Sequence, residues 1–214
     1  MEANYWRQRW ERGEIGFHES EVNPALVENL NRLNLAKGAR LFLPLCGKTL
    51  DIAWLLAQGY RIVGAELSAF AINELFAALD LVPEITPAGT LTRYSSTNID
   101  IWGGDIFDLS SSMLGAVDAI YDRAALVALP EHMRNRYAAH LIALTHAAPQ
   151  LLITYEYDQR LYDGPPFSVP EEELKQHYGG TYQLKQVTQD QIAGGLKGKV
   201  EAATVTWLLQ RNKP

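Results

Sequence analysis

The chain has 214 residues, of which 47% are hydrophobic and 21% are charged, so it is long and apolar enough for a globular domain with a sizeable core. This composition excludes a disordered chain, a collagen and a coiled coil as descriptions of the whole protein. Its 19 basic and 25 acidic residues give a net charge of −6, which argues against nucleic acid as the main partner.

The single cysteine, Cys46, excludes an internal disulfide and any zinc site built from several cysteines. No run reaches the roughly 18 apolar residues of a membrane helix, and the first residues lack the apolar core of a signal peptide. We therefore expect a cytoplasmic protein that does not contact a membrane. The histidines form no His-Glu-x-x-His pattern, so we expect no metal site and interpret His132, His140 and His146 as helix-surface residues.

Hydrophobic patterns alternate between helical and extended spacing along the whole chain. In chain order, they predict helices at residues 4–12, 24–33, 48–58, 68–79, 130–147 and 170–178, and strands at residues 40–43, 61–65, 99–102, 117–121, 151–155, 182–187 and 203–209. Strands that alternate with helices indicate an α/β fold with a mostly parallel sheet and helices on both faces. No helix separates the last two strands, which favours an antiparallel hairpin at the edge of the sheet. We expect one domain over residues 1–214.

Ligands of such sheets bind outside the carboxyl ends of the strands, which directs attention to the turns at residues 44–48, 66–68, 103–106 and 122–125. The first turn leads into Gly47-Lys48-Thr49, which resembles the end of a phosphate-binding loop. Phe42, however, occupies the place of the first glycine that this motif requires. The turn also lacks the glycines of a dinucleotide fingerprint. A phosphate-binding loop and a nicotinamide-dependent dehydrogenase are therefore both disfavoured.

Glu66 ends the second predicted strand, about 20 residues beyond the first turn, where nucleotide-binding sheets place an acidic side chain on the ribose hydroxyls. Because the pyrophosphate cradle is missing, this spacing favours a ligand that has a ribose and no phosphates. S-adenosylmethionine is the common ligand of that kind. The alternative is a surface glutamate at the start of a helix.

The small residues Gly103 and Gly104 follow the third predicted strand and precede Asp105 and Ile106. They would permit close approach of an adenine ring, and Asp105 could then contact its exocyclic amine. The alternative is a plain turn closed by an Asx hydrogen bond.

Arg123 follows the fourth predicted strand. It either points into the crevice and holds an anion, for which its planar guanidinium is well suited, or forms an ion pair with the nearby Asp118 or Asp122. Cys46 is interpreted as a small buried residue rather than a nucleophile, because nothing in the sequence marks an activating partner.

Several short blocks occur between Tyr5 and Pro170 in a specific order. They are Tyr5-Trp6-x-x-Arg9-Trp10, Gly16-Phe17-His18, Phe42-Leu43-Pro44-Leu45-Cys46-Gly47-Lys48, Val63-Gly64-Ala65-Glu66-Leu67-Ser68, Asp122-Arg123-x-Ala125-Leu126-Val127-Ala128-Leu129 and Gly164-Pro165-Pro166-Phe167-x-Val169-Pro170. In these blocks the chain resembles the thiopurine S-methyltransferase family in its bacterial form. The resemblance implies a class I methyltransferase fold, which is Rossmann-like, and S-adenosylmethionine as the methyl donor.

The resemblance also implies roles for individual residues. It places contacts with the methyl donor at Trp10, Leu45, Glu66, Asp105, Ile106 and Arg123. It places Phe17 and Arg123 at the methyl acceptor and makes Arg123 the catalytic candidate. Residues 1–35 are expected to form a lid region over the site, with Trp6, Trp10 and Phe17 as its aromatic side chains. The alternative for these three residues is a hydrophobic cluster that docks the N-terminus onto the sheet.

The activity implied by the resemblance is methyl transfer to the sulfur of a thiopurine or an aromatic thiol, which gives S-adenosylhomocysteine. Related bacterial enzymes are associated with methylation of selenium and tellurium oxyanions, so these acceptors and a role in metalloid resistance stay open. The alternative is a non-catalytic S-adenosylmethionine-binding regulatory module, which would need no acceptor pocket. Residues 189–199 do not match the family, which makes the acceptor the least transferable inference. We expect a monomer that acts on a small molecule.

Overall fold

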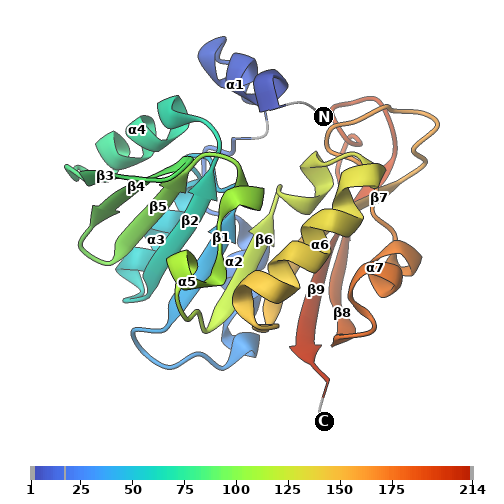
Figure 1. The fold of residues 1–214 in the computed structure, drawn as a ribbon. Coiled ribbons are helices and arrows are strands. Elements are labelled where there is room, and N and C mark those ends of the chain that lie inside the picture. Colours follow the sequence, from blue (N-terminus) through green and yellow to red (C-terminus); the bar gives the residue numbers. More distant parts are fainter. Residues whose placement is uncertain (1–2, 17, 213–214) are drawn as a thin grey trace.

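The structure is a computed structural model that describes residues 3–16 and 18–212, and these residues contain a nine-stranded mixed sheet (Figure 1). The strand order is β3-β4-β5-β2-β1-β6-β7-β9-β8. The strands are β1 (Arg40–Pro44), β2 (Arg61–Glu66), β3 (Glu84–Ala88), β4 (Leu91–Ser96), β5 (Ile99–Gly103), β6 (Ala119–Arg123), β7 (Gln150–Tyr157), β8 (Tyr182–Gln191) and β9 (Ala202–Arg211).

Helices connect most of these strands. They are α1 (Ala3–Glu11), α2 (Pro24–Asn29), α3 (Leu50–Ala57), α4 (Ala69–Ala78), α5 (Ser111–Leu114), α6 (Glu131–Thr145) and α7 (Glu171–Tyr178), with the short 3-10 turns η1 (Leu30–Leu33), η2 (Ile106–Asp108) and η3 (Leu126–Ala128). Within the described residues, none of these helices has the length and apolar character needed to cross a membrane.

A side chain caps the N-terminus of each of the helices α2, α3 and α4. The Asn23 side chain accepts a hydrogen bond from the Ala25 N–H, and Pro24 occupies the first turn of α2. Thr49 caps α3, and Ser68 caps α4. These side chains satisfy amide groups that have no partner within the helix, which is why each helix begins where it does. Asn23 before Pro24 and Ser68 before the helical pattern that ends near Leu79 are favourable cap residues by type, so the sequence predicts both caps, and the structure confirms them.

The five central strands, in the order β5-β2-β1-β6-β7, are parallel to one another. Antiparallel hairpins extend this parallel centre at both edges, with β9 and β8 beyond β7, and β4 and β3 beyond β5. The hairpin of β8 and β9 confirms the antiparallel edge that the sequence predicted for the last two strands. A parallel centre places the carboxyl ends of its strands along one edge of the sheet, where a ligand site can form.

The hairpin of β3 and β4 was not predicted from the sequence. Leu91 and Tyr94 of β4 are buried, whereas β3 is exposed along nearly its whole length. An apolar run therefore does not mark these strands, and Pro87 within β3 argues against a strand except at an edge. Residues 84–88 do form the edge of the sheet, where a proline that donates no hydrogen bond is tolerated.

Side chains of the central strands alternate between two hydrophobic cores, one on each face of the sheet. Phe42 and Ile120 belong to the core covered by α5, α6 and α7. Their neighbours Leu41, Leu43 and Tyr121 belong to the core covered by α2, α3 and α4. In Figure 1, α6 and α7 lie on the near face of the sheet and α3 lies on the far face. The expected arrangement of helices on both faces is confirmed.

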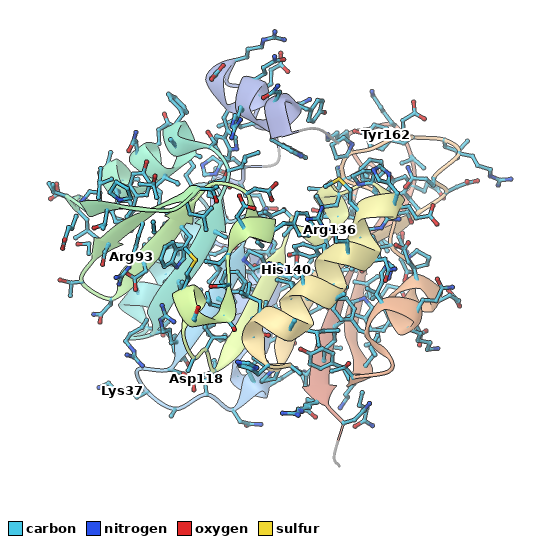
Figure 2. The ribbon with its side chains drawn as sticks, in the orientation of Figure 1. Lys37, Arg93, Asp118, Arg136, His140 and Tyr162 are labelled. Carbon is cyan, nitrogen blue, oxygen red and sulfur yellow. The ribbon has the colours of Figure 1, made fainter. Side chains whose placement is uncertain are left out.

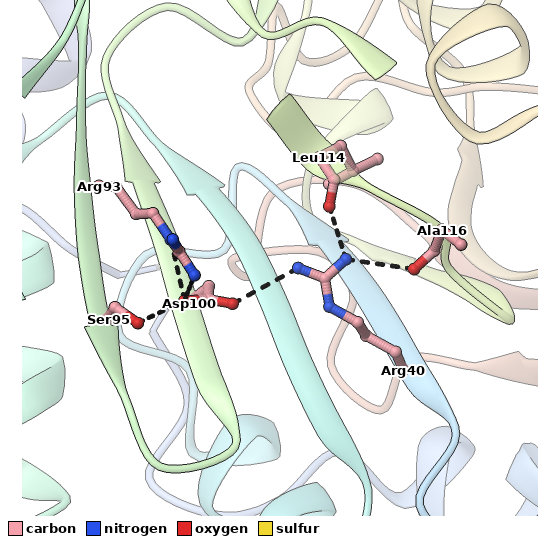
Figure 3. Close-up of polar contacts among 6 residues, drawn as sticks. All are labelled: Arg40, Arg93, Ser95, Asp100, Leu114 and Ala116. Carbon is pink, nitrogen blue, oxygen red and sulfur yellow. Dashed lines mark hydrogen bonds and ion pairs between the residues drawn. The ribbon is translucent and has the colours of Figure 1, made fainter. Parts of the chain in front are cut away.

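A polar cluster fixes the opposite, amino end of the central strands (Figure 3). The carboxylate of Asp100 accepts hydrogen bonds from Arg93 Nη2 at 2.8 Å and from Ser95 Oγ at 2.7 Å. Arg40 reaches the same carboxylate across β2, with 3.5 Å between Nη2 and Oδ2, and also donates to the Ala116 carbonyl oxygen at 3.2 Å. This cluster ties β1, β4 and β5 together at the end of the sheet away from the carboxyl ends of the strands.

The turn after β6 is shaped by a buried carboxylate. Asp122 is 0% exposed, and it accepts hydrogen bonds from the Leu126 N–H at 3.1 Å and from the Tyr137 hydroxyl at 2.8 Å. Burial raises the pKa of Asp122 from 3.8 to about 6, against the opposing effect of these hydrogen bonds. Asp122 therefore holds the turn that carries Arg123, at the cost of a buried charge near neutral pH.

We predict a pH-dependent stability effect from Asp122. Since its folded-state pKa of about 6 lies above the unfolded value of 3.8, the folded state binds the proton more tightly, and stability falls as pH rises through this window. Asp122→Asn lacks this cost, so its free energy of unfolding relative to wild type should increase by about 2–3 kcal/mol between pH 4 and pH 7. Denaturant unfolding at a series of pH values measures this difference.

Tyr137→Phe is the matched variant, because it removes a donor to the same carboxylate. The Tyr137 hydrogen bond lowers the pKa of Asp122, so its loss should raise that pKa. The pH range over which stability falls should then extend to higher pH. A difference between Asp122→Asn and wild type that does not change with pH would contradict the assignment.

Candidate functional site

A cavity of about 280 Å³ opens at the carboxyl ends of the central strands. Its volume lies near the lower end of the roughly 300–1,000 Å³ that is usual for small-molecule sites. Figure 1 shows α1 set apart from the sheet, beyond these strand ends. The described residues that the sequence analysis assigned to binding all line this cavity, and they are Trp10, Leu45, Glu66, Asp105, Ile106 and Arg123. Phe17 lies outside the described residues.

The turn after β1 forms one wall of the cavity. Leu45 and Gly47 both have left-handed backbone conformations, with φ values of 46° and 55°. A Cβ atom on Gly47 would lie 2.8 Å from Cζ2 of Trp10, so the indole packs directly on the glycine backbone. Trp10 is 4% exposed. Gly47 is thus needed both for the turn and for the contact that places α1 over the site.

Cys46 in the same turn is buried and packs against β2. A Cβ atom on Gly64 would lie 2.8 Å from the Cys46 sulfur. Burial, reinforced by Glu66, raises the pKa of the Cys46 thiol well above its ordinary value, so the sulfur stays protonated and a poor nucleophile. The geometry agrees with the interpretation of Cys46 as a packing residue.

Glu66 at the end of β2 is 5% exposed and holds two turns together. Its Oε2 accepts the Gly47 N–H and its Oε1 accepts the Ser68 N–H, each at 2.8 Å. Burial raises the pKa of Glu66, and the backbone hydrogen bonds oppose this effect. A carboxylate can accept about four hydrogen bonds, so Glu66 keeps capacity for hydroxyl groups of a ligand in the cavity.

The turn after β5 forms a second wall. The Oδ1 atom of Asp105 accepts the Phe107 N–H at 3.0 Å, which is the Asx hydrogen bond of the alternative interpretation. Asp105 is nevertheless exposed and lines the cavity together with Ile106 and Phe107. An Asx bond and a ligand contact are compatible, because a carboxylate has further acceptor positions.

Two residues of α6 support this turn (Figure 2). The His140 Nε2 atom lies 2.8 Å from the Ile106 carbonyl oxygen, which accepts its proton. The Arg136 guanidinium lies over the Phe107 ring, 3.8 Å from its centroid. The interpretation of His140 as a helix-surface residue is therefore wrong: it is partly buried against η2. Sequence reasoning missed this contact because the partner is a backbone atom remote in the chain.

Arg123 at the end of β6 has a side chain that is 9% exposed and faces the cavity. Its ion-pair partner is Glu19, whereas the expected partners are engaged elsewhere. Asp118 accepts the Arg40 N–H, and Asp122 binds Tyr137 and Leu126. The predicted pairing with Asp118 or Asp122 is therefore wrong, because successive side chains of a strand point to opposite faces and Asp122 points into the core.

The charge of Arg123 is favoured by its surroundings. Burial lowers its pKa, but Glu19, Tyr121 and Asp51 outweigh this effect and raise the pKa above the ordinary value. Asp51 is itself 1% exposed and accepts hydrogen bonds from the Tyr121 hydroxyl at 3.0 Å and from the Asn23 N–H at 2.8 Å. These polar groups join the N-terminal segment to the ends of β6 and α3.

Two loops from the C-terminal half complete the cavity. Pro165 and Pro166 line it, and their carbonyl oxygens accept hydrogen bonds from the hydroxyls of Tyr162 at 2.9 Å and Tyr157 at 2.7 Å. Lys197 also lines it and donates to the Pro165 carbonyl oxygen at 3.0 Å.

These loop residues had no role predicted from the sequence, and the same holds for further cavity residues, among them His18, Glu19, Asp51, Tyr121, Tyr155 and Leu196. The Pro-Pro pair was visible as part of a family block. Residues 196–197, in contrast, lie outside the short blocks that carry the resemblance, and no sequence signal shows where that loop folds back. Among the described residues, no group of three or more His, Cys, Asp and Glu side chains could hold a metal ion.

Comparison with known proteins agrees with this geometry. The family model described as thiopurine S-methyltransferase matches residues 1–211. The thiopurine S-methyltransferase of Xanthobacter autotrophicus is 55% identical over 212 residues, which cover 99% of this chain and 100% of that protein. The thiopurine S-methyltransferase of Teredinibacter turnerae is 52% identical over 212 residues, which cover 99% of each chain.

Solved structures show the same fold at low sequence identity. A SAM-dependent methyltransferase from Anabaena variabilis superposes with a TM-score of 0.65 at 14% identity, covering 98% of this chain and 95% of that one. The 1,6-didemethyltoxoflavin-N1-methyltransferase of Burkholderia thailandensis, solved with bound 1,6-didemethyltoxoflavin and S-adenosylhomocysteine, superposes with a TM-score of 0.64 at 16% identity, covering 97% of this chain and 87% of that one. The fold is that of the S-adenosylmethionine-dependent methyltransferases, and on sequence the chain belongs to the thiopurine S-methyltransferase family.

Proposed function

We propose that the protein transfers the methyl group of S-adenosylmethionine to the sulfur of a thiopurine or an aromatic thiol and releases S-adenosylhomocysteine. The observation that carries the proposal is the placement of Glu66 and Arg123 on one cavity, at the ends of the two strands that flank β1. The chain order of the strands reverses beside β1, and crevices at such points hold ligands. An acid for ribose hydroxyls and a cation for an anionic acceptor thus lie on either side of one strand.

The residues around Glu66 fit a nucleoside without phosphates. Glu66 retains acceptor capacity for ribose hydroxyls, and the exposed Asp105 and the buried Ile106 provide a polar and an apolar contact for adenine. The turn at Leu45 and Gly47 lacks the glycine-rich backbone that cradles phosphates, so it suits a ligand with an amino acid in that position. These features support S-adenosylmethionine as the ligand.

Arg123 would position the acceptor. S-adenosylmethionine supplies an electrophilic sulfonium methyl group, so the protein mainly has to align the acceptor and exclude water. The guanidinium favours the anionic form of the acceptor, and a thiopurine reaches its anion near neutral pH, so a strong general base is not required. The aromatic faces of Trp6 and Trp10, which line the same cavity, would favour the sulfonium charge.

We assign a lid role to the N-terminal region, residues 1–35, within a single domain that spans the chain. Three contacts support this role, since Trp10 packs on Gly47, Glu19 pairs with Arg123, and the Asn23 N–H is bound by Asp51. Each contact joins the N-terminal segment to the wall of the cavity.

A screen of acceptors tests the function and its alternative. Purified protein is incubated with S-adenosylmethionine and a thiopurine, an aromatic thiol, selenite or tellurite, and S-adenosylhomocysteine is measured. We expect product with the thiopurine and the aromatic thiol, and product with the oxyanions would extend the activity to metalloids. Binding of S-adenosylmethionine without product from any acceptor would instead support a regulatory module.

The ribose assignment predicts that Glu66→Gln weakens binding of S-adenosylmethionine. Hydrogen bonds to a charged acceptor contribute about 1.5–3 kcal/mol, so the dissociation constant should rise by tenfold or more. Calorimetric titration with S-adenosylhomocysteine measures the change without turnover. Glu28→Gln removes an exposed acidic charge of α2 and should leave the affinity unchanged. Wild-type affinity in a folded Glu66→Gln protein would refute the assignment.

Arg123→Lys keeps the positive charge but loses the planar guanidinium, so kcat/KM for methyl transfer should fall by about tenfold. Arg123→Ala should lower it further, with a smaller effect on unfolding than on rate. Some weakening of S-adenosylmethionine binding is expected, because Arg123 lies near both ligands. If Arg123→Ala shows wild-type kinetics and wild-type donor affinity, the residue does not belong to the site.

Deletion of residues 1–17 should abolish turnover but retain cooperative unfolding, because the described part of this segment, residues 3–16, contributes to neither the sheet nor its two hydrophobic cores. Steady-state assays and thermal unfolding measure the two properties. Loss of cooperative unfolding would show that the segment is part of the core, and full activity would exclude a lid role and a donor contact for Trp10.

A further inference from the structure

Glu19 lies between α1 and α2 and forms part of the cavity wall. Its Oε1 atom forms an ion pair with Nη2 of Arg123. The Arg123 side chain is 9% exposed and that of Glu19 is 42% exposed, so the pair extends from the cavity wall towards solvent. The cation that would hold an anionic acceptor is therefore already neutralised by a carboxylate of the same chain.

The pairing is specific to Glu19. Within the described residues, the other carboxylates near the end of β6 have different partners: Asp122 binds Tyr137, and Asp51 binds Tyr121 and the backbone of Asn23. Removal of Glu19 would leave the guanidinium without an ion-pair partner at short range. A largely buried cation without a partner binds anions readily, because pairing compensates its lost hydration.

Glu19 also has a second partner available. Its other oxygen, Oε2, accepts a hydrogen bond from the Asn23 side-chain amide at 3.3 Å. Asn23 is in turn fixed by its backbone N–H to Asp51 and caps α2. The Glu19 carboxylate can therefore leave Arg123 and keep a hydrogen bond to Asn23, and its exposure allows water to satisfy the remaining oxygen.

We propose that Glu19 is a specificity-determining residue that competes with the acceptor for Arg123. An anionic acceptor exchanges with the Glu19 carboxylate, so the guanidinium is paired before and after binding. Weakly binding anions do not complete this exchange, since they gain too little from Arg123 to displace the internal carboxylate. The inference rests on the proposed function, in which Arg123 holds the acceptor, and adds that Glu19 sets how strongly an anion must bind to enter.

The test compares an aromatic anion with a neutral aromatic molecule of similar size. Benzoate and benzyl alcohol are titrated calorimetrically into protein saturated with S-adenosylhomocysteine. Glu19→Gln should lower the dissociation constant of benzoate by about three- to tenfold, the range expected for a partly exposed ion pair, and leave that of benzyl alcohol unchanged. Glu28→Gln removes one exposed negative charge elsewhere in the same region and should change neither value.

A double variant separates competition from a general charge effect. In an Arg123→Ala background, Glu19→Gln should give no gain in benzoate affinity, because the cation for which Glu19 competes is absent. The proposal is overturned if Glu19→Gln leaves benzoate binding unchanged or weaker, if it strengthens both ligands equally, or if the gain persists without Arg123. These binding measurements need no turnover, so a failure of the acceptor screen would refute the proposed function independently.

Discussion

The buried carboxylate of Glu66 organises the site. It accepts amide protons from Gly47, in the turn after β1, and from Ser68, at the start of α4, each at 2.8 Å. This clamp joins the carboxyl ends of two adjacent parallel strands. A charge that is 5% exposed needs such hydrogen bonds to be tolerated. The clamp also shapes the cavity, because the turn that it holds contains Leu45 and Gly47, and the indole of Trp10 packs on Gly47.

The site divides into a rigid part and a part that is held by a few contacts. Glu66 and Arg123 are the last residues of central strands and Asp105 follows another, and the side chains of these strands pack into two continuous cores. The N-terminal segment instead touches the site through separate contacts, of which the Trp10 packing and the Glu19 ion pair are the closest to the cavity. This division fits the lid role that we propose for the N-terminal region, since alignment requires fixed groups whereas entry of ligands requires a cover that can open.

Much of the fold could be predicted because it depends on local patterns. The buried central strands are apolar runs, and the helices between them have caps such as Asn23 and Ser68 that the sequence displays. The strand-end residues that line the cavity could also be located, because the ends of parallel strands meet at one edge of the sheet. The hairpin of β3 and β4 was missed because an exposed edge strand needs no apolar pattern, and Pro87 is tolerated there.

The sequence by itself determined the fold class, the family and the residues at the strand ends, because these depend on periodicity, spacing and short motifs. Only the tertiary structure decided which groups meet across the cavity. It pairs Arg123 with Glu19 rather than with Asp118 or Asp122, and it brings Lys197 to the site from a loop without a motif. The physical reason is that ion pairs and hydrogen bonds act over a few ångströms in space, whereas the segments that form them lie far apart along the chain.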